Sequence, residues 1–170
     1  MKKLTMILAL TAFLAIPAMV SAQGQGDAAS ISATATVIAQ LEVSGEEDLR
    51  FGDVIPGIAS TIAATDVGNA GRFQIQGGGN QEVSLSFDNL TELAATGGAT
   101  LPFAFGSSSA GFGVSSGEAD GTFDPLAGTD QRLDNGVLYV FVGGTVTPTA
   151  GQPAGSYEGQ ITLNVAYTGN

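Results

Sequence analysis

The chain has 170 residues, with 16 acidic and only five basic side chains, and it contains no histidine and no cysteine. The missing residue types exclude His-based catalytic triads, His or Cys metal centres and disulfide bonds, so we expect neither an enzyme nor a cofactor. The acidic balance also excludes nucleic acid as a partner, because binding to phosphates requires clustered Lys and Arg that replace counterions.

The first 22 residues have the layout of a secretory signal peptide. Lys2 and Lys3 precede an apolar run over 4–20, and small residues follow up to Ala22. Cleavage after Ala22 leaves 148 residues, in which three arginines face 16 acidic residues for a net charge of −13. No later apolar run is long enough to span a membrane. We therefore expect a protein that is secreted through the periplasm to the extracellular space or the cell surface.

The start of the expected mature chain divides into a lead-in and a long alternating segment. Residues 23–29 are small and polar and predict a flexible N-terminal lead-in. Over 30–43, apolar residues occupy the odd positions and mainly polar residues the even ones, with a break at Ile38. Period two over this length predicts a long strand with one buried face.

Shorter strands follow at regular intervals. Alternating or continuous apolar runs are found around 49–51, 58–64, 73–75, 83–87, 101–105, 137–142 and 157–167. The continuous run over 137–142 is typical of a strand that is buried on both faces. Residues 89–95 contain a capping pattern, with Asn89 followed three positions later by Glu92, and predict at most one short helical turn. Residues 106–135 predict long loops with weak strands around Phe112 and Phe123.

The spacing of these elements predicts the fold class. Clusters of Gly, Ser, Asp, Asn and Thr separate the apolar runs, as a sheet of antiparallel strands with short turns requires. We therefore expect an all-β chain in which 30–170 form a single antiparallel β-sandwich.

Two local patterns suggest chemistry. Residues 113–117 match G-x-S-x-G, but that nucleophile elbow needs a strand-to-helix turn and a His base, and the chain has no His. We therefore assign no catalytic, cofactor-binding or metal residues. Carboxylates in the 106–135 loops leave weak calcium binding open, because extracellular Ca²⁺ prefers such oxygen ligands. They are Glu118, Asp120, Asp124, Asp130 and Asp134, with Asn135 adjacent.

Several of these motifs resemble a known type of protein. Ala33–Val37 reads ATATV, Leu49–Gly52 reads L-x-F-G with Pro56-Gly57 shortly after, and the chain closes with a strand at 161–167. In these features the chain resembles an uncharacterised domain family of secreted bacterial proteins, similar to pilin-like and spore-coat-like surface subunits. The resemblance implies an immunoglobulin-like, pilin-like sandwich and a surface role, and it supplies no catalytic residues.

Two functions are consistent with this sequence. The first is a cell-surface structural subunit of a pilus, filament or matrix, which self-associates by adding its N-terminal strand to a neighbouring copy. In that case residues 37–43 pair within their own domain, while both pairing in cis and pairing in trans stay open for 27–36. The alternative is a monomeric extracellular binding module, an adhesin or calcium-dependent sugar binder, that uses the 106–135 loops.

Overall fold

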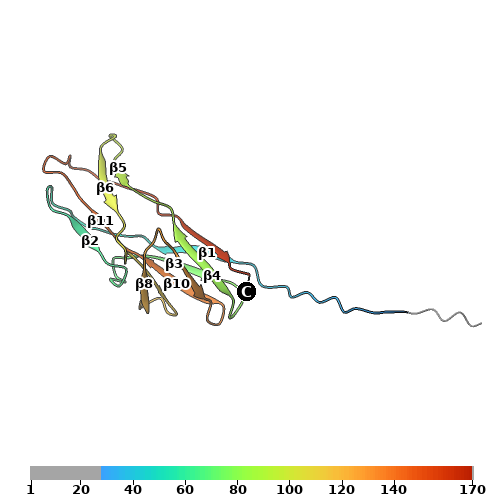
Figure 1. Ribbon diagram of the computed structural model, residues 1–170. Coiled ribbons are helices and arrows are strands. Elements are labelled where there is room, and N and C mark those ends of the chain that lie inside the picture. The colour runs from blue at the N-terminus through green and yellow to red at the C-terminus, as the bar shows by residue number, and fades with distance from the viewer. Residues whose placement is uncertain (1–27, 170) are drawn as a thin grey trace, which may run out of the picture. The chain divides into compact units, whose positions relative to one another are not determined.

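A computed structural model describes residues 28–169, and all regular secondary structure in this range is β-strand (Figure 1). The chain divides into two units, Met1–Ala35 and Thr36–Asn170. Residues 28–35 of the first unit contain no helix or strand. The second unit contains β1 (Glu42–Glu47), β2 (Ser60–Ile62), β3 (Gly71–Gln76), β4 (Glu82–Phe87), β5 (Glu92–Ala94), β6 (Thr100–Ala104), β7 (Ala110–Gly113), β8 (Gly121–Phe123), β9 (Thr129–Arg132), β10 (Val137–Val142), β11 (Gly144–Val146) and β12 (Leu163–Tyr167).

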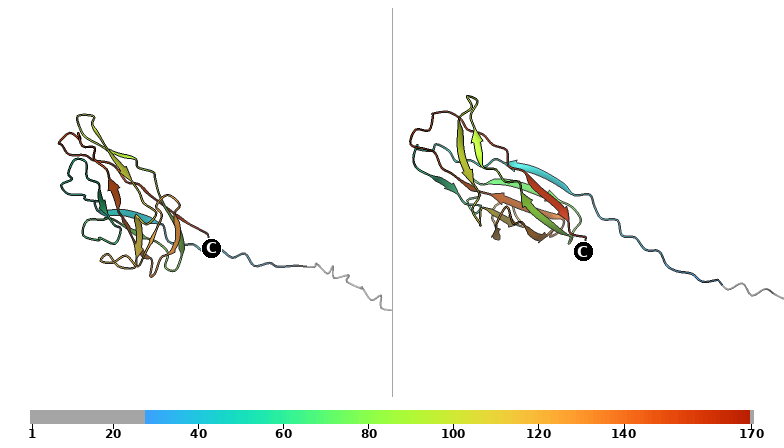
Figure 2. Two further views of the ribbon diagram at one scale, coloured as in Figure 1. Left: turned by 60° about the vertical axis from the view of Figure 1, so that its left-hand side comes forward. Right: turned by 45° about the horizontal axis from the view of Figure 1, so that its top comes forward.

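The strands of the second unit form three sheets, which confirms the expected all-β sandwich. One sheet has the order β1-β3-β10-β7-β8, the second β2-β11-β6-β5 and the third β12-β4-β9. Every strand pairing is antiparallel. Figure 2 shows β12, in red, beside its partner β4, in green. The sheets pack in the manner of an immunoglobulin-like sandwich.

The main core lies between the five-stranded and the three-stranded sheet. The alternation predicted for 83–87 is confirmed, because every second side chain of β4 is buried. The consecutive residues Val140, Phe141 and Val142 are all buried, so the end of β10 is covered on both faces as predicted. The buried members of this cluster are Ile75, Val83, Leu85, Phe87, Ala110, Phe123, Leu133, Leu138, Val140 and Val142.

A second, smaller core cluster lies at the four-stranded sheet. It is centred on Leu101, Phe103 and Val146, which come from β6 and β11. The rings of Phe103 and Phe105 meet edge to face with centroids 4.9 Å apart, a favoured geometry for aromatic pairs. Phe105 and Ile161 pack against both clusters and join them.

The prediction of one long strand over 30–43 is wrong. Residues 28–41 contain no strand, and β1 covers only Glu42–Glu47 with all its residues exposed. The reason is the length of the partner strand. Glu42 pairs with Gln76, the last residue of β3, and the chain then turns away through Gly77. Residues 30–41 therefore have the alternation of a strand but no neighbouring ladder within the described chain.

No helical turn forms near 89–95, where the sequence predicts at most one. Residues Glu92–Ala94 form β5, which pairs with β6 and places Leu93 opposite Leu101. The pattern of a helix cap cannot overcome the cost of helix nucleation over so few residues. The Gly97-Gly98 turn, with Gly98 at φ +83°, instead closes a hairpin in which Leu93 packs on the second core cluster.

The segment 106–135 contains the expected weak strands and one more. Phe112 lies in β7 and Phe123 in β8, while β9 forms a further short strand that pairs with β4. Within 28–169 there is no helix with the length and hydropathy that a membrane crossing requires. The predicted signal peptide and residues 23–27 of the predicted lead-in lie outside the described residues.

Candidate functional site

The most unusual surface of the described chain is the segment 28–41, which we call the N-terminal segment. Every residue from 28 to 40 is exposed, with Ile31 at 96% and Val37 at 95%. Its sequence contains no charged residue, although the whole chain has 16 acidic ones. An apolar, alternating and uncharged stretch without a pairing partner is a template for strand addition.

Tyr167 anchors the end of this segment. Its hydroxyl donates to the carbonyl of Ala39 at 2.9 Å and accepts from the N–H of Gly78 at 2.7 Å. Leu41 then packs partly buried against the main core. The hydroxyl of Tyr167, at the end of β12, thereby holds Ala39, just before β1, and Gly78, in the turn between β3 and β4. Residues 39–41 are thus held in place at the start of the sandwich.

Tyr167→Phe is expected to destabilise the domain by about 1–2 kcal/mol, because two hydrogen bonds are lost and the Gly78 N–H loses its partner. Tyr139→Phe is the matched control, since the Tyr139 hydroxyl accepts one hydrogen bond, from Gln74, at 2.9 Å. Urea unfolding of both variants measures the difference. Equal losses of stability in the two variants would refute the anchoring role of Tyr167.

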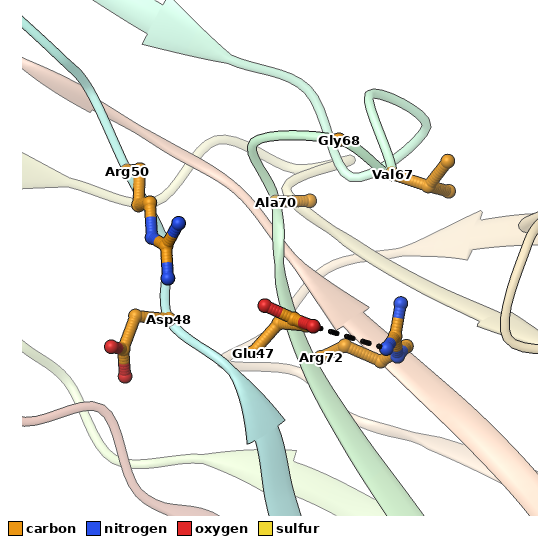
Figure 3. A pocket seen from close by; sticks show the side chains of 7 residues that line it. All are labelled: Glu47, Asp48, Arg50, Val67, Gly68, Ala70 and Arg72. Atoms are coloured by element: carbon orange, nitrogen blue, oxygen red, sulfur yellow. Dashed lines mark ion pairs between the residues drawn. The ribbon is translucent and has the colours of Figure 1, made fainter.

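A shallow hollow of about 210 Å³ lies beside the end of β1 (Figure 3). Arg72 is one of the seven residues that line it, and its Nε lies 2.9 Å from a carboxylate oxygen of Glu46 and its Nη2 3.6 Å from a carboxylate oxygen of Glu47. A further nitrogen of Arg72 donates to the carbonyl of Ser116 at 3.1 Å. These contacts use the guanidinium to hold β1, β3 and the β7–β8 loop together. Partly exposed ion pairs of this kind contribute under about 1 kcal/mol each.

Two of the five acidic residues of 106–135, Asp120 and Asp124, accept hydrogen bonds from the backbone of their own turns. A carboxylate oxygen of Asp120 accepts from the N–H of Val114 at 2.9 Å. One oxygen of Asp124 accepts from Leu126 at 3.0 Å and, at 3.4 Å, from Ala127. Among residues 28–169, no three acidic side chains come together in a way that could hold a metal ion. Glu118, Asp130, Asp134 and Asn135 are exposed.

The G-x-S-x-G match at 113–117 lies in a β-turn. It begins at Gly113, the last residue of β7, and contains Ser115, which forms an isolated bridge with Glu118 before β8 begins. Ser115 is exposed and stands between two strands. The strand-to-helix turn that the nucleophile elbow requires is therefore missing at this position.

Comparison with known proteins places the chain in a family. The model of the family described as a domain of unknown function, DUF4402, matches residues 41–167. The chain belongs to this family. No curated protein matches the sequence. The DUF4402 match begins at Leu41, the first residue that packs on the core, and ends at Tyr167, the anchor. The exposed part of the N-terminal segment precedes the matched range.

The sequence did not reveal which residues hold the segment in place. Tyr167 is only one of three tyrosines, and nothing in its spacing indicates a bond to Ala39, 128 residues away. The sequence likewise does not predict that Arg72 bonds to Glu46 and Ser116, because these residues lie far from it along the chain. The alternation over 30–43 was the one available signal, and it indicated the segment itself.

Proposed function

We propose that this protein is a secreted, non-catalytic structural subunit of the bacterial cell surface, of a pilin-like or matrix kind. It assembles with copies of itself by β-strand addition through residues 30–37. The observation that carries the proposal is the exposure of an alternating apolar segment that has no strand partner among residues 28–169, with Ile31 96% and Val37 95% exposed.

Strand addition accounts for the apolar alternation of this segment and for its lack of a strand partner within the described chain. Its backbone N–H and C=O groups gain partners in a neighbouring sheet, and every second side chain is covered. Covering one Val or Ile side chain contributes about 1.5–3 kcal/mol. Four apolar odd positions, Ile31, Ala33, Ala35 and Val37, are available for this purpose. The secretory pattern of residues 1–22 supports an extracellular location for such an assembly.

Removing residues 23–36 is expected to abolish assembly while leaving a folded domain, because the matched family domain begins only at residue 41. Size-exclusion chromatography and electron microscopy of the purified mature protein give the readout. Removing only 23–29 is the matched control and is expected to preserve assembly, since it leaves the alternating residues in place.

Two results would contradict the proposal. The first is a 23–36 deletion variant that assembles as well as the full mature chain. The second is a full mature chain that stays monomeric and whose melting temperature rises with calcium, which would favour a binding module that uses the 106–135 loops.

A further inference from the structure

The outer strands of the three sheets differ in how well they are protected against pairing. They are β1 and β8, β2 and β5, and β12 and β9. Charged side chains stand on three of them: Glu42, Glu46 and Glu47 on β1, Glu92 on β5, and Asp130 and Arg132 on β9. Strands β2 and β8 are uncharged but only three residues long. Short length and charge are the usual protections of a sheet edge, and β12, with five uncharged residues, has neither.

The backbone of β12 offers one side to a further strand. At its two ends, Thr168 N–H donates to the Glu82 carbonyl and Asp88 N–H donates to the Thr162 carbonyl, both at 3.1 Å. In an antiparallel pair, hydrogen-bonded residues recur at every second position. The even-numbered residues of β12 therefore bond to β4. The N–H and C=O groups of the odd-numbered residues within Leu163–Tyr167 face away from β4.

The side chains of β12 give this edge an apolar inner face and a neutral outer face. Leu163, Val165 and Tyr167 are only half-buried and pack against the main core. Asn164 and Ala166 are exposed on the other face. An added strand with apolar odd positions would cover the half-buried residues and complete that side of the core.

The position of β12 relative to β1 leaves this side of the sandwich incompletely covered. The two are the outer strands of opposing sheets, and the bond from Tyr167 to Ala39 places the end of β12 beside the chain that leads into β1. Phe73 of β3, opposite Gly45 of β1, is likewise only half-buried. Figure 2 shows β1, in cyan, and β12, in red, on this side of the second unit.

We propose that β12 of one copy is the acceptor edge for residues 31–37 of a second copy. This inference rests on the proposed function and adds the strand that accepts the donor segment. The donor and β12 are both uncharged, in a chain with 16 acidic residues, so they pair without the like-charge repulsion that β1 would impose. The apolar odd residues of the donor then face the core with Leu163 and Val165. Its even residues lie on the outer face with Ala166.

Disulfide trapping between two copies tests the acceptor, because the natural chain has no cysteine. One copy has Ala166→Cys, and the other has a single substitution at an even donor position, Ser32→Cys, Thr34→Cys or Thr36→Cys. Opposed residues on one face of a sheet approach closely enough for a disulfide. We expect at least one even position to give a mixed disulfide, identified by peptide mass spectrometry, at least about tenfold above Ala33→Cys and Ala35→Cys, which lie on the opposite face.

A copy with Ser44→Cys on β1 is the competing acceptor. Assembly that cross-links to position 44 and not to position 166 would overturn the acceptor and leave the proposed function standing. The same conclusion follows if the assembled protein gives equal cross-linking from odd and even donor positions. A mature chain that size-exclusion chromatography shows to be monomeric, without any cross-link, would overturn both proposals.

Discussion

Gly143→Ala is expected to destabilise the domain by about 3 kcal/mol, the upper end of the usual cost of overpacking. Gly143 is buried between β10 and β11, where the chain passes from the five-stranded to the four-stranded sheet. A Cβ at this position would collide with the carbonyl oxygen of Ile62. It would also lie 2.9 Å from the carbonyl carbon of Ala63 and the nitrogen of Ala64. All three atoms belong to the backbone, so no side-chain rotation relieves the contact.

Gly97→Ala is the matched control for this substitution. A Cβ at Gly97 meets no atom within 4 Å, and its φ lies outside the left-handed region. We expect its free energy of unfolding to stay within about 0.5 kcal/mol of the natural domain. Guanidinium unfolding of both variants gives the comparison. If Gly143→Ala unfolds at the same denaturant concentration as Gly97→Ala, the backbone of residues 62–64 does not lie as close to Gly143 as the structure shows.

Much of the sandwich could be predicted from local pattern. The side chains Val83, Leu85 and Phe87 repeat with period two because one face of β4 lies on the core. The continuous run at Val140–Val142 reports burial on both faces. In both cases the pattern is local, because successive side chains of a strand point to opposite faces, and the burial of one face or of both decides which positions are apolar.

The sequence-based predictions differ from the structure where strand pairing depends on residues outside the local pattern. Residues 30–41 alternate like a strand, with a single break at Ile38, yet β3 ends at Gln76 and offers them no ladder. Residues Glu92–Ala94 have a weak helical signal, yet the turn at Gly97-Gly98 and the contact with β6 decide their conformation. Alternation indicates a capacity to pair, and the availability of an edge determines whether the pairing occurs within the chain.

The candidate site could be predicted only in part for the same reason. The donor is contiguous in sequence, so its apolar alternation and its lack of charge are visible without a structure. The acceptor edge depends on which strands end up outermost, and β12 becomes an edge because only β4 pairs with it among the described strands. The anchor at Tyr167 joins residues 128 positions apart, which no spacing rule would connect.

Val37→Asp is expected to weaken assembly by at least about 100-fold, which corresponds to about 2.8 kcal/mol. In the separate chain Val37 is 95% exposed, so the new carboxylate stays in water and the stability of the domain is unchanged. In the proposed assembly, odd-numbered donor residues face the core beside Leu163 and Val165. An unpaired carboxylate there loses its hydration without gaining a partner, at a cost of several kcal/mol.

Thr36→Asp separates this effect from simple charge repulsion. Thr36 is adjacent to Val37 and is also exposed, and an aspartate there adds the same charge to the same acidic chain. As an even position, it lies on the outer face of the added strand, where the carboxylate keeps its water. The concentration of half-assembly, measured by analytical ultracentrifugation, should therefore rise far less than for Val37→Asp. Equal losses in the two variants would show that net charge, and not the face of a paired strand, controls assembly.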